Sequence, residues 1–334
     1  MLTKNENERF TQIGPGTPAG ALLRRYWQPA CIASELTEEH PKKRVRILGE
    51  DVVVFRLPAE PGEDRLRYGC LAEHCAHRGT SLYYGFLEQD GLRCAYHGWK
   101  YAPDGRCLEQ PFESSPAFKE RICQVAYPVE KLGGLLFVYM GPPDKRPLLP
   151  RWDVLVREDG ERYIEQHPVL DCNWLQPMEN TVDPAHLFWL HGHTMRLRGS
   201  HAGDIYHRPV KGFYWDVCEW GIMKLEVYDE GHVALDVMPP LVFPNILRIC
   251  QHIDEAIHFR LPIDDSHTQI FCVILKPAAQ KIPQPEDPPV VKLVHKDEEG
   301  EFLLDTFPSQ DAMAWETQGA VANRPGEHLG SSDR

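Results

Sequence analysis

Short apolar runs separated by turn residues dominate about the first 140 positions of the chain. Residues 45–48, 51–55 and 135–139 are rich in β-branched and aromatic side chains, and Gly-Glu, Asp-Gly and Gly-Gly pairs punctuate the region. Such runs are typical of β-strands. Residues 17–27 differ, because a Thr-Pro pair precedes an amphipathic stretch, as at the start of a short helix. The pattern therefore predicts a small all-β domain that follows one short helix.

The second half of the chain predicts a mixture of helices and strands. A proline-rich stretch over residues 141–150 has the composition of a linker. Beyond it, the pattern favours a helix over residues 173–192 and a last helix from about Ser309. Strands are expected at residues 233–237, 245–250 and 270–275. We therefore expect an α+β protein of two domains, with residues 1–145 in the first and residues 146–334 in the second.

The composition is that of a globular protein with an acidic surface. Hydrophobic residues make up 42% of the 334 positions, which is too many for a disordered chain. Lys and Arg number 36 against 49 Asp and Glu, and the net charge of −13 disfavours a nucleic-acid partner. No apolar run approaches the roughly 20 residues that span a membrane, and the polar N-terminus has no secretory signal. We therefore expect a cytoplasmic protein.

Two loops of the first domain carry cysteine and histidine in a repeated arrangement. Their sequences are Cys75-Ala-His77-Arg-Gly and Cys94-Ala-Tyr-His97-Gly-Trp. A Rieske [2Fe-2S] cluster binds two thiolates on one iron and two imidazoles on the other, so two such loops that meet at their tips provide every ligand. A glycine close after each histidine allows the tight backbone that this arrangement requires.

A structural zinc site is the alternative for the same four side chains. Zinc-finger spacing usually places two histidines together after two cysteines, whereas cysteine and histidine alternate in this chain. The other cysteines are scattered, as small buried hydrophobic residues are. The alternation favours the Rieske cluster.

A second candidate site is the segment Asp183-x-x-His186-x4-His191. Two histidines and a carboxylate leave open positions on a mononuclear iron, and a redox cluster in the same chain needs such an electron acceptor. The alternative is an ordinary helix start, since Asp183 and the proline after it are a common N-cap pair. On a regular helix the two histidines lie roughly 140° apart, so they can bind one metal only where the helix ends or distorts. Gly192 is well placed to help.

With these motifs, the chain resembles the α subunits of Rieske non-haem iron aromatic ring-hydroxylating oxygenases, especially the phthalate dioxygenase-like branch. Besides the two loops, the resemblance is carried by residues 14–20, 23–29, 173–174, 179–191, 310–311 and 327–334. It implies an N-terminal Rieske domain and a C-terminal helix-grip catalytic domain, in which an antiparallel sheet wraps round a helix. Members usually continue with further helix beyond the last of these segments, so we expect a short member or a truncated chain.

The resemblance also implies a role for individual residues. The ligands that it implies are Cys75 and Cys94 for one cluster iron and His77 and His97 for the other. For the mononuclear iron it implies His186, His191 and Asp311. From the residues alone, Asp305 and Glu316 remain alternatives to Asp311, which could instead be a first-turn acid at the helix N-terminus. Asp183 is implied to hydrogen-bond to His186 and to reach the Rieske ligand His97 of a neighbouring subunit.

The implied activity is that of a terminal oxygenase, which uses O₂ and electrons to hydroxylate an aromatic substrate that we expect to be an acid. No Gly-rich dinucleotide fingerprint opens a helix after a strand, so we expect a separate NAD(P)H-dependent reductase. O-demethylation or another monooxygenation is the alternative reaction, and a non-catalytic Rieske electron carrier is the alternative protein class. The resemblance implies a ring-shaped oligomer, a homotrimer or hexamer.

The substrate pocket offers several candidate residues. An acid requires a buried cation, and Arg248 and Arg260 lie in expected strands of the catalytic domain. Either arginine could equally be a surface residue. The aromatic residues that could line a pocket or form core are Tyr214, Trp215, Trp220, Phe243 and Trp315.

Overall fold

The computed structural model describes residues 2–59, 66–207, 210–228, 238–250 and 254–333. The chain forms two compact units. The first, called the β unit here, comprises residues 14–16 and 20–151. The second, called the α+β unit, comprises residues 1–13, 17–19 and 152–334. The strand expected at residues 233–237 lies outside the described residues.

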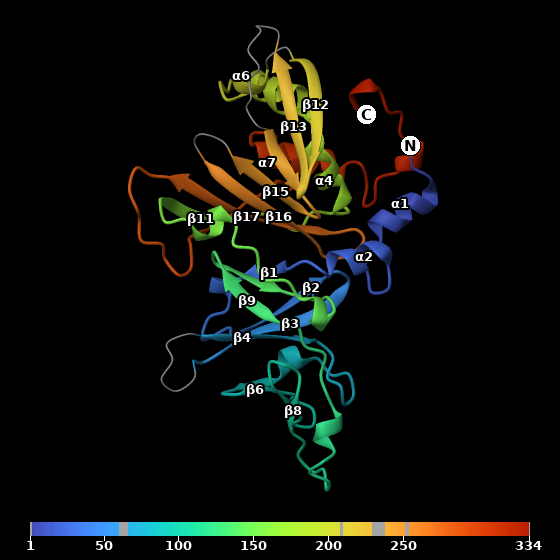
Figure 1. The fold of residues 1–334 in the computed structure, drawn as a ribbon, viewed down its shortest axis with the longest axis vertical. Helices are drawn as coiled ribbons and strands as arrows, with labels where there is room; N and C mark the ends of the chain where they lie inside the picture. The colour runs from blue at the N-terminus through green and yellow to red at the C-terminus, as the bar shows by residue number, and fades with distance from the viewer. Residues whose placement is uncertain (1, 60–65, 208–209, 229–237, 251–253, 334) are drawn as a thin grey trace. The chain divides into compact units, whose positions relative to one another are not determined.

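The described part of the β unit contains three antiparallel sheets (Figure 1). One has the order β1 (Gln28–Ile32), β10 (Leu135–Val138) and β9 (Val129–Leu132). Another joins β2 (Lys42–Ile47), β3 (Glu50–Leu57) and β4 (Arg67–Ala72). The last contains β5 (Phe86–Glu88), β6 (Gly91–Arg93), β7 (Lys100–Tyr101) and β8 (Cys107–Glu109). The strands expected near residues 45, 51 and 135 are confirmed as β2, β3 and β10.

A core of aliphatic and aromatic side chains joins the sheet of β2 to β4 with the sheet of β5 to β8. Val53, Phe55 and Leu57 alternate along β3 and are fully buried, since one face of a strand carries every second residue. The same cluster includes Cys75 and Cys94. The two cysteine loops are therefore anchored in the hydrophobic core.

The α+β unit is built on a long sheet. Its described strands run in the order β12 (Val210–Cys218), β13 (Gly221–Tyr228), β14 (Met238–Val242), β15 (Ile246–Cys250), β16 (Glu255–Pro262), β17 (Thr268–Pro277), β11 (Gly160–Gln166) and β18 (Val290–Lys292). Neighbours are antiparallel except β11 and β18. The strands expected at residues 245–250 and 270–275 are confirmed as β15 and β17.

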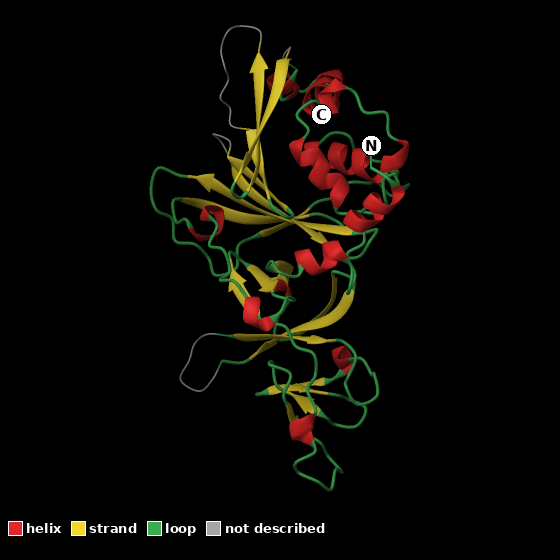
Figure 2. Ribbon diagram, turned by 45° about the vertical axis from the view of Figure 1, so that its right-hand side comes forward, coloured by secondary structure: helices red, strands yellow, loops and turns green. Residues whose placement is uncertain are grey.

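Helices gather on one side of this sheet (Figure 2). They include α4 (Leu175–Val182) and α7 (Phe307–Glu316), which contact each other, and α4 also contacts β13, β14 and β15. The shorter helices of the chain are α2 (Pro18–Leu23), α3 (Asp153–Val156), α5 (Thr194–Leu197), α6 (Gly203–Tyr206) and the single turns η1 (Ala33–Glu35), η2 (Leu82–Tyr84), η3 (Lys119–Arg121), η4 (Pro143–Lys145), η6 (Arg324–Gly326) and η7 (Ser331–Asp333). An antiparallel sheet that packs on helices is the expected α+β, helix-grip type of architecture. In the described residues no helix combines the length and apolar character needed to cross a membrane.

The N-terminal helix corrects our division of the chain. We expected residues 1–13 in the first domain, but α1 (Lys4–Thr11) belongs to the α+β unit. The Asn7 side-chain amide donates to the Ala322 carbonyl at 3.0 Å, and Arg324 donates to the side-chain oxygen Oδ1 of Asn7 at 3.0 Å. These hydrogen bonds join segments over 300 positions apart, which no local pattern predicts. Residues 146–151 stay with the β unit instead.

Replacement of Arg324 tests how strongly this junction stabilises the unit. The arginine is 1% exposed and donates two hydrogen bonds of 2.6 Å to the Glu179 carboxylate. We expect Arg324→Ala to lower the free energy of unfolding by about 2 kcal/mol, because the buried arginine loses its charge-assisted hydrogen bonds while the half-exposed Glu179 carboxylate can be solvated. Urea denaturation followed by tryptophan fluorescence measures it. The matched control is Arg106→Ala, whose exposed pair with Asp104 should matter by less than about 1 kcal/mol. Equal losses would contradict the assignment.

Candidate active site

The two Cys/His loops share one backbone conformation. The Gly79 amide donates to the Cys75 carbonyl at 2.8 Å, and the Gly98 amide donates to the Cys94 carbonyl at 3.0 Å. Both glycines have positive φ, of 72° and 73°, in the left-handed region that side chains other than glycine rarely adopt. Each loop is thus a tight turn that follows a cysteine, and each turn carries one histidine near its tip.

The side chains of these loops converge. The His77 and His97 rings lie 4.6 Å apart between centroids, and both cysteines are nearly fully buried. Trp99 stacks on the His77 ring at 4.2 Å and fixes its plane. The Nδ1 atom of His97 is buried without a hydrogen-bond partner.

These observations fit a group that binds sulfur and nitrogen together. An unpaired buried imidazole nitrogen is costly unless a ligand occupies it. Burial raises the pKa of the Cys94 thiol, although the backbone N–H of Tyr96 opposes the shift, so a bound cation is needed to hold it as a thiolate. Two buried thiols and two adjacent imidazoles are the donor set of a Rieske cluster.

The second histidine pair lies on a distorted helix. α4 ends at Val182, and a π-helix, η5 (Leu187–His193), follows after His186. In a π-helix the hydrogen bonds join residues i and i+5, so residues five apart lie on one face. The ring centroids of His186 and His191 are 5.2 Å apart as a result. The expected distortion between the two histidines is confirmed, and its form is π-helical.

Gly192 makes this turn possible. A Cβ atom at that position would lie 2.8 Å from the backbone nitrogen of His207, so any side chain would push α6 away. Asp183 is the C-cap of α4, and its side chain also makes the type of contact that the N-cap alternative expected, to the segment that follows. Its Oδ1 accepts a hydrogen bond from the Ala185 amide at 2.7 Å.

Asp311 on α7 completes a group of three possible metal ligands. One atom from each of His186, His191 and Asp311 lies within 4.8 Å of the others. The Nε2 atom of His191 is 3.3 Å from Asp311 Oδ1, but the geometry is not that of a hydrogen bond and Oδ1 is buried without a partner. A shared metal ion fits three donors that converge without bonding to one another.

Two side chains orient the histidine rings by contacts at their Nδ1 atoms. Asp183 Oδ2 lies 3.3 Å from His186 Nδ1, and Gln310 Oε1 lies 2.8 Å from His191 Nδ1. Both contacts leave the Nε2 atoms for the metal, as carboxylate and carbonyl partners of ligating imidazoles do. Sequence reasoning found the Asp183 contact and missed that of Gln310, although Gln310 directly precedes Asp311.

The two acids that remained alternatives to Asp311 lie elsewhere. Glu316 pairs with Lys296 at 2.5 Å. Asp305 is exposed and lies outside the group of converging ligands.

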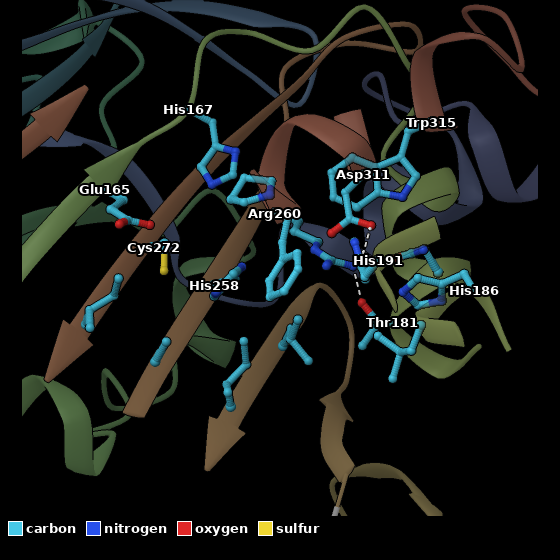
Figure 3. A pocket seen from close by; sticks show the side chains of 18 of the residues that line it. Glu165, His167, Thr181, His186, His191, His258, Arg260, Cys272, Asp311 and Trp315 are labelled. Atoms are coloured by element: carbon cyan, nitrogen blue, oxygen red, sulfur yellow. Dashed lines mark hydrogen bonds and ion pairs between the residues drawn. The ribbon is translucent and has the colours of Figure 1, made fainter. Parts of the chain in front are cut away.

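The three ligands line a cavity of about 370 Å³ (Figure 3). Apolar side chains from the sheet, among them Leu247, Ile249 and Ile274, form much of its wall. Trp315 also lines it, and its indole nitrogen is buried without a partner. The other aromatic candidates do not line this cavity, and Tyr214, Trp220 and Phe243 are exposed. A mainly apolar cavity next to a metal site suits an aromatic ligand.

Two cations are buried at the same cavity. Arg260 is 2% exposed, and its Nη1 donates to the Pro177 carbonyl and the Thr181 hydroxyl. Burial lowers the pKa of Arg260 to about 10, so the guanidinium stays charged at neutral pH. Burial also lowers the pKa of Lys224 to about 8, against the opposing charges of Asp183 and Glu226. Lys224 donates to the Thr181 carbonyl at 2.7 Å.

Arg248 has a different environment. Its guanidinium pairs with Asp153 at 2.7 Å and with Glu255 at 2.5 Å, and it does not line the cavity. Of the two arginines proposed from the sequence, Arg260 is the one at the cavity.

Comparison with known proteins identifies the family. Residues 26–128 match the family model described as the Rieske [2Fe-2S] domain. Over 100% of its length the chain is 34% identical to the 5,5'-dehydrodivanillate O-demethylase oxygenase subunit of Sphingobium sp., covering 78% of that protein. The chain belongs to the Rieske-type oxygenase subunits. It is also 35% identical to the phenoxybenzoate dioxygenase subunit alpha of Ectopseudomonas oleovorans, over 97% of this chain and 80% of that one.

Solved structures of Rieske oxygenases agree in fold. The oxygenase in the ferredoxin complex of carbazole 1,9a-dioxygenase matches with a TM-score of 0.67 at 19% identity, over 98% of this chain and 88% of that one. The family resemblance and the fold class expected from the sequence are thereby confirmed. This oxygenase subunit is an oxidoreductase of the dioxygenase and monooxygenase type, whose family carries a [2Fe-2S] Rieske cluster and a mononuclear iron.

Replacement of a Rieske histidine by cysteine tests the cluster ligands. We expect His97→Cys to retain a [2Fe-2S] centre whose potential falls from the Rieske range towards about −400 mV, because a thiolate replaces a neutral imidazole. Spectroelectrochemical titration measures the midpoint. His74→Cys is the matched control, since His74 bonds the Gly79 carbonyl at 2.9 Å in the same loop. A midpoint unchanged in His97→Cys would contradict the ligand assignment.

Proposed function

We propose that Cys75, His77, Cys94 and His97 hold the Rieske cluster, and that His186, His191 and Asp311 hold the mononuclear iron. The convergence of three donors within 4.8 Å at an apolar cavity supports the second assignment most directly. Iron bound there supplies electron transfer and activation of O₂, which no side chain can supply. On this proposal the β unit is the Rieske domain and the α+β unit is the catalytic domain.

The protein's own residues prepare this site. Asp183 and Gln310 hold the two imidazoles so that each turns Nε2 towards the metal. Burial of His191 and of the aliphatic wall keeps bulk water from the ligands. Arg260 is held in place by the backbone of Pro177 and the side chain of Thr181, which lie on the same helix, α4. The cavity is thus arranged before a substrate enters.

Loss of one ligand tests the iron assignment. We expect Asp311→Ala to lose the mononuclear iron and all substrate turnover, while acid-labile sulfide and the visible cluster absorption stay at wild-type levels. Iron and sulfide analysis on anaerobically purified protein measures both. Glu316→Ala, at the C-terminal end of α7, is the control. Full iron content and activity in Asp311→Ala would make Asp305 or Glu316 the leading ligand.

We further propose that the substrate is an aromatic acid. Arg260 carries this step, because it is a buried guanidinium at the cavity wall. Among the described residues it has no carboxylate within ion-pair distance, and Asp311, whose charge acts on it, is assigned to the proposed iron. Its Nε atom is buried without a hydrogen bond. The guanidinium carbon Cζ lies 5.3 Å from the centroid of the Trp315 ring. A substrate carboxylate satisfies both the charge and the free donor. The names of the two relatives are those of enzymes for aromatic acids, which agrees with this proposal.

A ligand pair tests the carboxylate site. We expect Arg260→Gln to weaken benzoate binding about 100-fold and to leave benzamide binding nearly unchanged, because only benzoate carries the charge that pairs with the arginine. Anaerobic titration calorimetry measures both affinities. Equal losses for the two ligands would contradict a carboxylate contact.

The reaction itself is tested with a panel of acids. Benzoate, phthalate, 3-phenoxybenzoate and vanillate are added separately to chemically reduced protein, and ¹⁸O₂ starts a single turnover. Two labelled oxygen atoms in the product indicate dioxygenation, which we propose. One labelled atom, or loss of the vanillate methyl group, indicates the alternative monooxygenation or O-demethylation, which the name of one relative favours.

We propose a separate reductase as electron donor and a ring-shaped oligomer, a trimer or hexamer. The solved oxygenase of carbazole 1,9a-dioxygenase is in complex with a ferredoxin, which supports a separate donor. The Asp183 side chain is 42% exposed while it contacts His186, so it can also face a neighbour. In a closed ring, each cluster would serve the iron of the next subunit through Asp183.

Subunit mixing tests this arrangement. His97→Cys and His186→Ala are each expected to be inactive, but their co-expression should restore part of the activity, because some neighbours then pair an intact cluster with an intact iron site. Differently tagged copies purified in tandem show that mixed rings form. Mixed rings without activity would mean that electrons pass within one chain.

A further inference from the structure

Buried polar atoms without partners cluster at the cavity. Four of its lining residues have such an atom: His167 Nε2, Arg260 Nε, Asp311 Oδ1 and Trp315 Nε1. Each unpaired buried group costs roughly 1–3 kcal/mol, so each marks a place where a ligand belongs. The proposed iron accounts for Asp311, and the proposed carboxylate accounts for Arg260 and its neighbour Trp315. His167 is left without an explanation.

His167 directly follows β11 and is 4% exposed. Figure 3 shows its ring on the opposite side of the cavity from His186. The cavity therefore has a polar group on the side away from His186, which a ligand that fills the cavity can contact.

A chain of hydrogen bonds connects His167 to the surface. His167 Nδ1 lies 3.1 Å from His295 Nε2, and His295 Nδ1 lies 3.1 Å from Ser309 Oγ. The Thr306 hydroxyl donates to Ser309 Oγ at 2.8 Å. Both His295 and Ser309 are nearly fully buried, whereas Thr306 is exposed. The chain thus runs without a break from solvent to the cavity.

The hydrogen atoms of this chain can be arranged in two ways. In the first, Ser309 donates to His295, His295 donates to His167, and His167 Nε2–H points into the cavity. In the second, Ser309 donates to the Val294 carbonyl at 3.4 Å, both histidines carry their proton on Nδ1, and His167 Nε2 is an acceptor. Conversion of the first into the second passes one proton to an atom in the cavity.

The environment keeps both histidines neutral, as either arrangement requires. Burial, together with the charges of His258, His295 and Arg260, lowers the pKa of His167 well below its usual value. Burial also lowers the pKa of His295. If both rings were doubly protonated, His167 Nδ1–H and His295 Nε2–H would face each other without an acceptor, and the chain would be interrupted.

We propose that His167 Nε2 is a hydroxyl-binding subsite of the cavity and that Thr306, Ser309 and His295 deliver a proton from solvent to the oxygen bound there. A hydroxyl group both donates and accepts, so it suits both arrangements, whereas a carboxylate or an ether suits only the first. This rests on the proposed function and deepens it: the substrate or product is an aromatic acid that bears a hydroxyl group in addition to its carboxylate.

Oxygenation consumes protons, and a hydrogen-bonded chain from solvent can supply them. One substrate, one O₂, two electrons and two protons yield either a dihydroxylated product or one hydroxylated product and water. The reductase supplies the electrons. The protons must come from solvent, and the relay supplies one of them: Thr306 gives its proton to Ser309, Ser309 to His295, His295 to His167 and His167 to the bound oxygen, while water reprotonates Thr306.

Phenol and toluene test the hydroxyl subsite, since neither carries a carboxylate and their binding can be measured without turnover. Their affinities for oxidised, anaerobic holoprotein are measured by calorimetry. We expect the ratio of phenol to toluene affinity to fall about tenfold in His167→Phe and to persist in His167→Gln, which keeps a polar group near Nε2. His258→Phe is the matched control, because His258 lines the same cavity but is not part of the chain. An unchanged ratio in His167→Phe, or an equal fall in His258→Phe, would overturn the subsite.

An isosteric pair at Ser309 tests the relay without changing His167. Bound 4-nitrophenolate is protonated by a rapid drop in pH and followed by stopped-flow absorbance. We expect Ser309→Val to slow the protonation of bound 4-nitrophenolate at least about tenfold. Ser309→Thr should keep the wild-type rate, because threonine has the shape of valine but retains the hydroxyl group. Equal rates in the two variants would overturn the relay. Failure of benzoate to bind would contradict the proposed aromatic acid and would leave both of these measurements valid.

Discussion

Two histidines five residues apart can face one metal ion only if their backbone leaves α-helical geometry. In this protein α4 ends one residue before Asp183, and a π-helical segment carries His191 back over His186. The lack of a side chain at Gly192 lets α6 approach this segment. The convergence of His186 and His191 with Asp311 depends on this one departure.

Burial of charge is the second feature of the α+β unit. Arg260 and Lys224 lie among aliphatic side chains, where an unpaired charge is costly, and α4 provides backbone and hydroxyl acceptors for both. Such groups contribute little to stability, since apolar residues of similar size would pack as well. The anionic substrate that we propose would explain their position at the cavity, which the proposed iron ligands and His167 also line.

The β unit anchors its two Cys/His loops in the hydrophobic core. Cys75 and Cys94 belong to the hydrophobic core and anchor the two loops, whereas His77 and His97 lie near the tips of the turns. Tyr101, fully buried, lies 3.2 Å from Cys75 Sγ, and Trp99 covers His77. Hydrogen bonds to sulfur and exclusion of water are both means by which a protein tunes an iron–sulfur cluster.

Local pattern was enough to predict what depends on nearby residues. The Cys/His loops, the strands β2, β3, β10, β15 and β17, and the need for a distorted helix at His186 and His191 could all be read from spacing and turn residues. Tertiary structure decided what depends on distant residues: α1 packs on the second unit through Asn7 and Arg324, Gln310 orients His191, and His167 meets His295 across 128 positions. Neither Arg248 nor Arg260 has a sequence signal for its role, because both sit in similar strands and differ only in the face to which they point. Periodicity places a side chain on one face of an element, but only the packing of elements determines what lies opposite that face.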